Sequence, residues 1–501
     1  ITYGDWSSDV CSSDLWRPAS TSTCSTPTGR PADRTGAEMP ATRPPCGAAV
    51  QASKLGRKVL VVEKSQHVGG LCTELGTIPS KTFREAVRSL TRRSLMLSLY
   101  SIGARPVRPT MQALLSRVHS VVERESLVVH DQFDRNEIEV MHGTASFDGP
   151  NRIAVEVQEG VKRVTTRFAM IGTGSRAIMP GDTQTDPECV FTGDTILQAP
   201  RLPRTLLVIG AGVIGMEYAS MFASAGVQVT VMDKFERPLS FIDHEIVDEL
   251  VHQMRLAQVT FRLGEEVAGA AKEKGADGHT RVTVTTKSGK KLTAEMVLVS
   301  AGRTGNVEKL NLSAVGLQPD DRGRLKVDDR FRTSVPWIFA AGDVIGAPGL
   351  AATSYEQGRI AACEMFGEPH PGMSAHWPYG IYSVPELSCA GQNEEQLTKD
   401  CVPYEIGIAR YAESARGQIR GDDSGLMKLI FHRETRKLLG VHCIGSQATE
   451  LVHIGQAVMA LGGGLDYFLS TVFNYPTFAE CYKVAALNCL NRLRAVEECP
   501  K

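Results

Sequence analysis

The sequence has almost no excess charge of either sign, no long apolar run and few cysteines. Its 55 Lys and Arg residues nearly balance 56 Asp and Glu residues, for a formal net charge of −1. This balance argues against nucleic acid or an anionic membrane as the main partner. No run of about eighteen apolar residues occurs, so we expect no transmembrane helix. Because 12 cysteines in 501 residues are too dilute for a disulfide scaffold, we expect a cytoplasmic protein with mostly reduced thiols.

Residues 1–46 differ in composition from the rest of the chain. They are rich in Ser, Thr, Pro, Arg and Gly and show neither helical nor alternating apolar periodicity. They also lack an apolar stretch long enough for a secretory signal. Within them, Asp5–Leu15 resembles the translation of a sequencing adapter. We expect residues 1–46 to be an aberrant or disordered N-terminus, produced by a sequencing or reading-frame artefact, that carries no chemistry; the alternative is a natural disordered tail.

From Gly47 onward the sequence becomes regular. Lys58–Glu63 predicts a buried strand that ends in an acidic residue, and helical patterns alternate with such strands further along the chain. This alternation favours α/β layers with parallel sheets. Other expected elements are a helix over Ala48–Leu55 ended by Gly56, a helix from about Ser80 to Ser98, a β meander over 138–171 and a helix from about Ala448.

The clearest unit is a strand, a glycine-rich turn, a helix and a returning strand. An apolar strand at 205–209 precedes Gly210, Gly212 and Gly215, and Asp233 ends the returning strand. In such a turn the first glycine permits the bend, the second lets the backbone approach a pyrophosphate, and the third lets the helix pack on the strand. Unpaired N–H groups and the helix dipole then attract the anion. The pattern predicts a dinucleotide site; the alternative is a turn that binds nothing.

The residue that ends this unit bears on the choice of dinucleotide. The Asp233 carboxylate would accept hydrogen bonds from an adenosine ribose and repel a 2′-phosphate, which favours NAD. Lys234 and Arg237 lie close enough in sequence to offer that phosphate a counter-charge. The same site could therefore serve NADP.

A second motif occupies residues 68–81 (VGGLCTELGTIPSK). With it the chain resembles the FAD-dependent pyridine nucleotide–disulfide oxidoreductases, whose signature GGxCxxxGCIPSK carries two redox cysteines. Cys72 matches the first cysteine, but Thr77 stands at the second position. One thiol cannot form a dithiol, so the usual disulfide relay is excluded.

The C-terminal segment departs from the family in a related way. The disulfide reductases carry a His directly before a Pro, with a Glu four residues beyond that Pro, to manage thiol protons. Here Glu480 is present but Tyr475 occupies the His position. Hydride transfer from one nicotinamide to flavin and on to another needs proximity and orientation rather than a thiol or an acid–base pair. The resemblance, which covers about residues 47–494, therefore implies a homodimeric transhydrogenase of the Si-specific type that uses FAD, NAD and NADP.

The resemblance also implies roles for single residues. Glu63 would bind the ribose of FAD, and Asp343 its ribityl hydroxyls. Lys81 and Glu217, the implied catalytic residues, would form an ion pair beside the flavin N5. Other implied cofactor-binding residues are Cys72, Thr173, Gly174, Gly302, Leu350 and Ala351, the last two at the start of a helix that would point at the N1 side of the flavin. Three alternatives stay open: a packed inert Cys72, an Asp343 that only caps a turn, and an ordinary surface pair of Lys81 with Glu217.

One departure argues against function. In the family the FAD pyrophosphate sits on an N-terminal GxGxxG loop that follows the first strand. Here Pro40, Thr42 and Pro45 occupy the glycine positions, and no apolar strand precedes them. Because proline has no N–H to offer a phosphate, we expect this polypeptide to bind FAD poorly. We also expect the authentic gene product to carry both the strand and the glycines.

The implied architecture is α/β, with two Rossmann-like dinucleotide-binding domains and a C-terminal α+β dimerisation domain. The expected boundaries are 1–46 for the aberrant N-terminus, 47–184 and 308–370 for the two parts of the FAD domain, 185–307 for the NAD(P) domain, 371–494 for the dimerisation domain and 495–501 for a tail. The expected partners are nicotinamide dinucleotides and a second copy of the chain, with no nucleic acid, membrane or metal. The rival functions are a flavoprotein that reduces a quinone or other acceptor, a catalytically dead dimeric scaffold, and a lipoamide dehydrogenase, which Thr77 and Tyr475 oppose.

Overall fold

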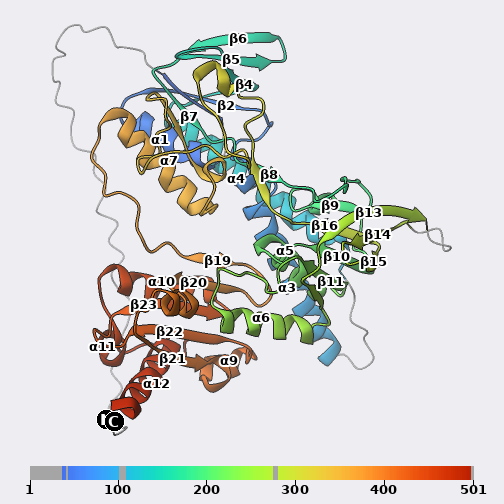
Figure 1. The fold of residues 1–501 in the computed structure, drawn as a ribbon, viewed down its shortest axis with the longest axis vertical. Helices are drawn as coiled ribbons and strands as arrows, with labels where there is room; N and C mark the ends of the chain where they lie inside the picture. Colours follow the sequence, from blue (N-terminus) through green and yellow to red (C-terminus); the bar gives the residue numbers. More distant parts are fainter. Residues whose placement is uncertain (1–35, 41–42, 101–108, 275–279, 498–501) are drawn as a thin grey trace, which may run out of the picture. The chain divides into compact units, whose positions relative to one another are not determined.

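The structure, a computed structural model, describes residues 36–40, 43–100, 109–274 and 280–497. In this part of the chain the strands form two parallel sheets and one antiparallel sheet of five strands each, with three smaller antiparallel sheets (Figure 1). Helices alternate with the strands of both parallel sheets, which confirms the predicted α/β class. No helix among these residues has the length and apolar character needed to cross a membrane.

The first region is built on a parallel sheet with the strand order β18-β7-β1-β2-β3. Helices α1 and α7 contact each other extensively, and a small antiparallel sheet, β4-β5-β6, follows β3 in the chain. The strands are β1 (Gly36–Pro40), β2 (Lys58–Glu63), β3 (Glu139–His142), β4 (Thr144–Phe147), β5 (Arg152–Val157), β6 (Gly160–Thr165), β7 (Phe168–Ile171) and β18 (Ile338–Ala340). The helices are α1 (Arg43–Lys54), α2 (Gly70–Glu74), α3 (Thr77–Tyr100), α4 (Met111–Arg135) and α7 (Ala351–Phe366).

The start of this region differs from the sequence prediction. A strand does precede the loop: β1 pairs in parallel with β2 and with β7, and so fills the middle of the sheet. Main-chain hydrogen bonds alone can hold a strand there, so its lack of an apolar pattern was a poor guide. Helix α1 begins at Arg43 rather than Ala48, because Pro44 and Pro45 fall in its first turn, where helical N–H groups have no partner within the helix. Most of the segment expected to be aberrant, residues 1–35 and 41–42, lies outside the described residues.

The second region repeats the same design. Its parallel sheet has the order β12-β11-β10-β16-β9, and a small sheet, β13-β14-β15, is attached to it in sequence. The strands are β9 (Val190–Thr192), β10 (Thr205–Ile209), β11 (Gln228–Asp233), β12 (Thr260–Leu263), β13 (Val267–Lys274), β14 (Thr280–Thr286), β15 (Lys291–Ala294) and β16 (Met296–Val299). The helices are α5 (Val213–Ser224) and α6 (His244–Leu256), and the strand pair β8 (Ser175–Ala177) and β17 (Arg303–Gly305) lies where the chain enters and leaves this region.

The third region is an antiparallel sheet with the order β19-β20-β23-β22-β21. Its strands are β19 (Tyr379–Ile381), β20 (Leu387–Gly391), β21 (Tyr404–Arg410), β22 (Leu426–His432) and β23 (Leu438–Ile444). Its helices are α8 (Glu394–Lys399), α9 (Ala415–Arg420), α10 (Ala448–Ala460), α11 (Leu465–Ser470) and α12 (Glu480–Glu497). The expected tail at 495–501 therefore starts inside α12, and residues 498–501 lie outside the described range.

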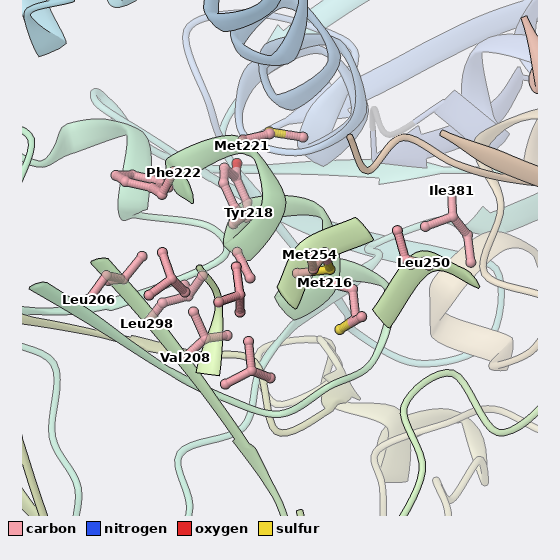
Figure 2. Packing of buried hydrophobic residues seen from close by; sticks show 14 of the residues in the cluster. Leu206, Val208, Met216, Tyr218, Met221, Phe222, Leu250, Met254, Leu298 and Ile381 are labelled. Carbon is pink, nitrogen blue, oxygen red and sulfur yellow. The ribbon is translucent and has the colours of Figure 1, made fainter. Parts of the chain in front are cut away.

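The largest buried cluster joins the second region to the third. Leu250 and Met254 of α6 belong to the same apolar cluster as Ile381 of β19 and Leu387 of β20, and Figure 2 shows Ile381 near Leu250. A buried ion pair lies at the same junction: the Lys428 ammonium of β22 is 2.9 Å from Oδ1 of Asp243, which caps α6. The parallel sheet of the second region and the antiparallel sheet of the third therefore share one core.

Candidate functional site

The glycine-rich turn of the second region has the geometry that its sequence predicts. Gly210 has a φ of 105°, in the region that favours glycine. A Cβ on Gly215 would overlap the carbonyl oxygen of Gly210, whereas a Cβ on Gly212 would meet nothing within 4 Å. The third glycine is thus required by the approach of helix to strand, and the second faces open space at the start of α5. The N–H groups of this helix end are available to an anion.

Asp233, at the end of β11, is held by the backbone around it. Its Oδ2 accepts the N–H of Ala211 from the glycine turn at 2.5 Å, and its Oδ1 accepts the N–H of Phe235 at 2.9 Å. A carboxylate has about four acceptor positions, so both oxygens can still accept from ribose hydroxyls.

Glu63 ends β2, the strand of the first sheet that corresponds to β11. Its side chain is 5% exposed, and its Oε1 accepts the N–H of Ser65 at 2.9 Å. Its Oε2 is buried and has no hydrogen-bond partner among the described residues. Desolvation by burial is the largest cause that raises the pKa of Glu63 to about 7. An unsatisfied buried carboxylate oxygen at this strand end suits a ribose hydroxyl donor.

A cavity of about 470 Å³ gathers residues from all three regions. Its walls include the start of α3, the first turns of α5 and α7, and the segment from 378 to 382. Of the residues predicted from sequence, Cys72, Lys81, Gly174, Glu217, Asp343, Leu350 and Ala351 line it. The others do not: Glu63, Thr173, Gly210, Gly212, Gly215, Asp233 and Gly302. Thr77 lines the same cavity as Cys72, so the two positions of the missing dithiol face one space.

Lys81 and Glu217 form the expected ion pair. The Lys81 ammonium lies 2.9 and 2.7 Å from the two carboxylate oxygens of Glu217, whose side chain is 3% exposed. The N–H of Tyr382 donates to Glu217 Oε1 at 2.8 Å, and the Lys81 ammonium lies 5.0 Å from the centre of the Tyr382 ring. Glu217 is buried and Lys81 is partly buried, so the two do not form an ordinary surface pair.

A second basic residue, Arg84, fixes the loop that carries Tyr382. Arg84 of α3 is buried, donates to the carbonyl oxygen of Ser383 at 2.8 Å and pairs with Glu386 at 2.7 Å. The N–H of Val384 donates to Ser220 Oγ of α5 at 3.0 Å. Helices α3 and α5 thus both bind the loop 382–384, and the Tyr382 N–H of this loop donates to Glu217.

Asp343 belongs to a polar chain at the other side of the cavity. Its Oδ2 accepts from the hydroxyl of Ser175 at 2.6 Å, and that hydroxyl accepts from Arg303 Nε at 2.8 Å. Arg303 also pairs with Asp194 at 2.8 Å. Asp343 therefore does more than cap a turn. Nearby, Thr173 has a buried hydroxyl without a partner among the described residues, and Gly302 has a φ of 124°.

Helix α7 begins beside this chain. Leu350 is its N-cap residue with no side-chain cap, and both Leu350 and Ala351 line the cavity. Its first N–H groups therefore have no side-chain acceptor from the cap residue. Together with the open oxygens of Glu63 and Thr173, this helix end fits the expected groups of FAD. The segment 40–45 does not fit, because three of its residues are proline and lack an N–H.

Sequence reasoning missed several residues of the cavity. Tyr382, Asp194 and His453 line it but come from segments without a motif. For Asp194 a weak signal was available, since its partner Arg303 directly follows Gly302, which the resemblance implies as a cofactor-binding residue. Nothing in the local sequence marked Tyr382, which acts through its main chain.

Two remaining features concern the C-terminal segment and metals. Tyr475 is 74% exposed, and Glu480 begins α12 and accepts the N–H of Thr477 at 3.2 Å. The described residues include one acidic group with metal-like spacing, Asp243, Glu245 and Glu394. The Lys428 ammonium contacts all three carboxylates, so a cation of the protein itself occupies that cluster.

Comparison with known proteins gives consistent matches over most of the chain. The family model "Pyridine nucleotide-disulphide oxidoreductase" matches residues 46–358, and the dimerisation-domain model of the same name matches residues 377–486. The chain is 48% identical over 457 residues to a protein of Mycobacterium tuberculosis named soluble pyridine nucleotide transhydrogenase, covering 90% of this chain and 96% of that protein. A protein of the same name from Hahella chejuensis is 43% identical over 453 residues, with coverage of 89% and 96%.

Solved structures match the fold at lower identity. LpdA from Mycobacterium tuberculosis superposes with a TM-score of 0.81 at 22% identity, covering 90% of this chain and 99% of that one. The flavoprotein disulfide reductase RclA from Escherichia coli gives a TM-score of 0.80 at 24% identity, with coverage of 90% and 99%. These two likenesses bear on the fold alone.

Proposed function

The chain belongs to the pyridine nucleotide–disulphide oxidoreductase family, and on that premise we propose that it is an FAD-dependent transhydrogenase that converts NADPH and NAD⁺ into NADP⁺ and NADH, and the reverse. One observation carries the proposal. Cys72 and Thr77 line a single cavity with the Lys81–Glu217 pair, so the place of the dithiol relay is present but cannot hold two thiols. The names of the similar proteins from Mycobacterium tuberculosis and Hahella chejuensis support the same activity.

FAD, when bound, supplies a ring that accepts a hydride from one nicotinamide and returns it to another. Glu63 and Thr173 would hold its ribose and phosphate end, and Asp343 its ribityl hydroxyls. The start of α7, at Leu350 and Ala351, would stabilise negative charge on the ring. These assignments rest on the open hydrogen-bonding groups described above.

The Lys81–Glu217 pair would act by position and charge. Glu217 is held by both Lys81 and the Tyr382 N–H, so the ammonium is fixed where it borders the cavity. A fixed cation stabilises the negative charge that arrives with each hydride and needs no proton transfer. Cys72 would contribute packing rather than redox chemistry.

The dimerisation-domain match supports a homodimer, and the names of the similar proteins support a cytoplasmic location. The C-terminal segment also carries exposed apolar side chains, which suit an interface between two copies. These are Val472, Tyr475, Val484 and Leu487.

The test is hydride transfer between nicotinamides by the full chain, with FAD supplied at saturating concentration. We expect NADPH to reduce thio-NAD⁺, and (4S)-deuterated NADPH to give NADP⁺ that has lost the deuterium, as the Si-specific type requires. Lys81→Met should slow the transfer roughly a hundredfold. Lys58→Met, which removes an exposed lysine 4.0 Å from Glu139, is the matched control and should leave the rate unchanged.

Three results would contradict the proposal. NADPH oxidation with a quinone but not with thio-NAD⁺ would indicate the rival reductase. A protein without flavin, even after its N-terminal loop is rebuilt with glycines, would indicate a scaffold. Efficient reduction of lipoamide would indicate a disulfide relay that Thr77 should prevent.

A further inference from the structure

A smaller cavity, of about 250 Å³, adjoins the larger cavity of about 470 Å³ that contains the Lys81–Glu217 pair. Lys81, Tyr382 and Thr449 line both cavities. The Tyr382 ring and the Thr449 side chain meet over Gly380, where an added Cβ would lie 3.3 Å from Tyr382 Cε2 and 3.2 Å from Thr449 Cγ2. These side chains therefore belong to the wall that the two cavities share.

Tyr382 contacts both members of the ion pair. Its N–H donates to Glu217 Oε1 at 2.8 Å, and the centre of its ring lies 5.0 Å from the Lys81 ammonium. The guanidinium carbon of Arg84 lies 6.0 Å from the centre of the same ring. Both distances fall within the range of about 6 Å over which a cation is attracted to an aromatic face. The carboxylate is thus bound by the main chain of Tyr382, and the ammonium is bound by its side chain.

The smaller cavity offers the Lys81 ammonium competing partners. Its lining includes the exposed carboxylates of Glu85 and Glu450. Lysine has a flexible stem and a strongly hydrated ammonium, and the Lys81 side chain is 26% exposed. An ammonium that turned toward these carboxylates, or toward water, would leave the larger cavity. The Tyr382 ring opposes that movement, because it lies in the shared wall and attracts the ammonium in its present place.

We propose that the side chain of Tyr382 is a positioning element, whose ring keeps the Lys81 ammonium on the side of the larger cavity and shields it from the smaller one. The inference deepens the proposed function and rests on it for the effect on hydride transfer. Every residue except proline supplies the N–H that binds Glu217, but only an aromatic residue supplies the ring. Position 382 therefore requires an aromatic side chain and does not require the hydroxyl.

The first measurement uses the full-length chain without flavin. Acetic anhydride at limiting concentration acylates accessible amines, and mass spectrometry of the peptide that contains Lys81 gives the extent of reaction. Tyr382→Leu keeps the N–H and an apolar side chain but removes the ring, so it should raise the acylation of Lys81 roughly tenfold. Tyr382→Phe should leave it unchanged. Unchanged acylation in Tyr382→Leu, or an equal rise in Tyr382→Phe, would overturn the inference.

The second measurement is the midpoint potential of FAD bound to the chain that carries Pro40→Gly, Thr42→Gly and Pro45→Gly. A displaced Lys81 ammonium stabilises negative charge on the reduced ring less well. Tyr382→Leu should therefore lower the potential by about 30 mV, which is a tenfold change for a two-electron couple. Tyr382→Phe should keep the potential. An unchanged potential in Tyr382→Leu would show that the ring does not position the cation for the reaction.

Tyr379→Leu is the matched control. Tyr379 lies on the same segment, and its ring contacts Phe241, with 5.3 Å between the ring centres. This variant should leave the acylation of Lys81 and the potential unchanged, and a rise in acylation equal to that of Tyr382→Leu would overturn the inference. Circular dichroism should show every variant folded. If Tyr382→Leu does not fold, Tyr382→Met carries the same expectations.

The two proposals can fail separately. Acylation of Lys81 and the flavin potential do not depend on transfer between nicotinamides. If both change as expected in Tyr382→Leu but NADPH does not reduce thio-NAD⁺, the proposed function fails and the positioning role of Tyr382 stands.

Discussion

Glu63 and Asp233 occupy the same place in two repeats of one design, yet their surroundings differ. Each ends the second strand of a strand–helix–strand unit, and each accepts the N–H two residues further on at 2.9 Å. The second oxygen of Asp233 accepts an N–H from the glycine turn, whereas the second oxygen of Glu63 is buried with no partner among the described residues. The loop before α5, next to Asp233, carries the three glycines of the motif. The loop before α1, in the repeat that contains Glu63, carries prolines instead. The comparison shows how a strand-end carboxylate depends on the turn that faces it.

The largest expected effect comes from giving the loop between β1 and α1 the glycines that the loop between β10 and α5 carries. The combined variant Pro40→Gly, Thr42→Gly, Pro45→Gly should raise the flavin content of the purified protein from well below one FAD per chain toward one. Glycine returns the N–H groups that proline lacks and allows the close approach of a pyrophosphate. Visible absorbance of the purified protein is the measurement. The matched control replaces Pro18, Thr23 and Pro27 by glycine and should change nothing; equal flavin content in all three proteins would show that the loop is not the cause.

A smaller effect is expected from replacing single glycines of the loop between β10 and α5 by alanine. Gly215→Ala should lower the free energy of unfolding by about 3 kcal/mol, because its Cβ would overlap the Gly210 carbonyl oxygen. Gly212→Ala has open space and should keep its stability while losing affinity for 5′-ADP. Urea unfolding and calorimetry separate the two outcomes. Equal stability losses in both variants would contradict the geometry of the turn.

The smallest effect concerns the pH dependence of stability. The pKa of Glu63 is about 7 in the folded protein and 4.5 in the reference state, so the folded state keeps a proton between these values that the unfolded state has lost. Stability should therefore fall as the pH rises from about 5 to 8, by roughly 3 kcal/mol at most. Glu63→Gln should remove this part of the slope. Urea midpoints at pH 5 and pH 8 in both proteins give the difference, and parallel slopes would refute the assignment.

Sequence alone predicted the parts of the site that local rules control. Gly210 and Gly215 follow from the steric needs of one turn, and the Lys81–Glu217 pair followed from the family resemblance. Residues that act through their main chain left no signal, since Tyr382 contributes an N–H that every residue but proline carries. Strand β1 was missed for a related reason: its place depends on pairing with β2 and β7, which a single segment does not reveal.

The core shared by α6, β19 and β20 has a consequence for how the enzyme would work. Because Leu250 and Met254 are buried together with Ile381 and Leu387, the parallel sheet of the second region cannot swing as a hinged lid without exposing apolar surface to water. Adjustments that admit and release successive coenzymes must then be small and local. Side chains that line the cavity can supply them, such as Tyr218, whose buried hydroxyl has no hydrogen-bond partner among the described residues. The shared core therefore favours small side-chain movements around the cavity over the movement of a whole region.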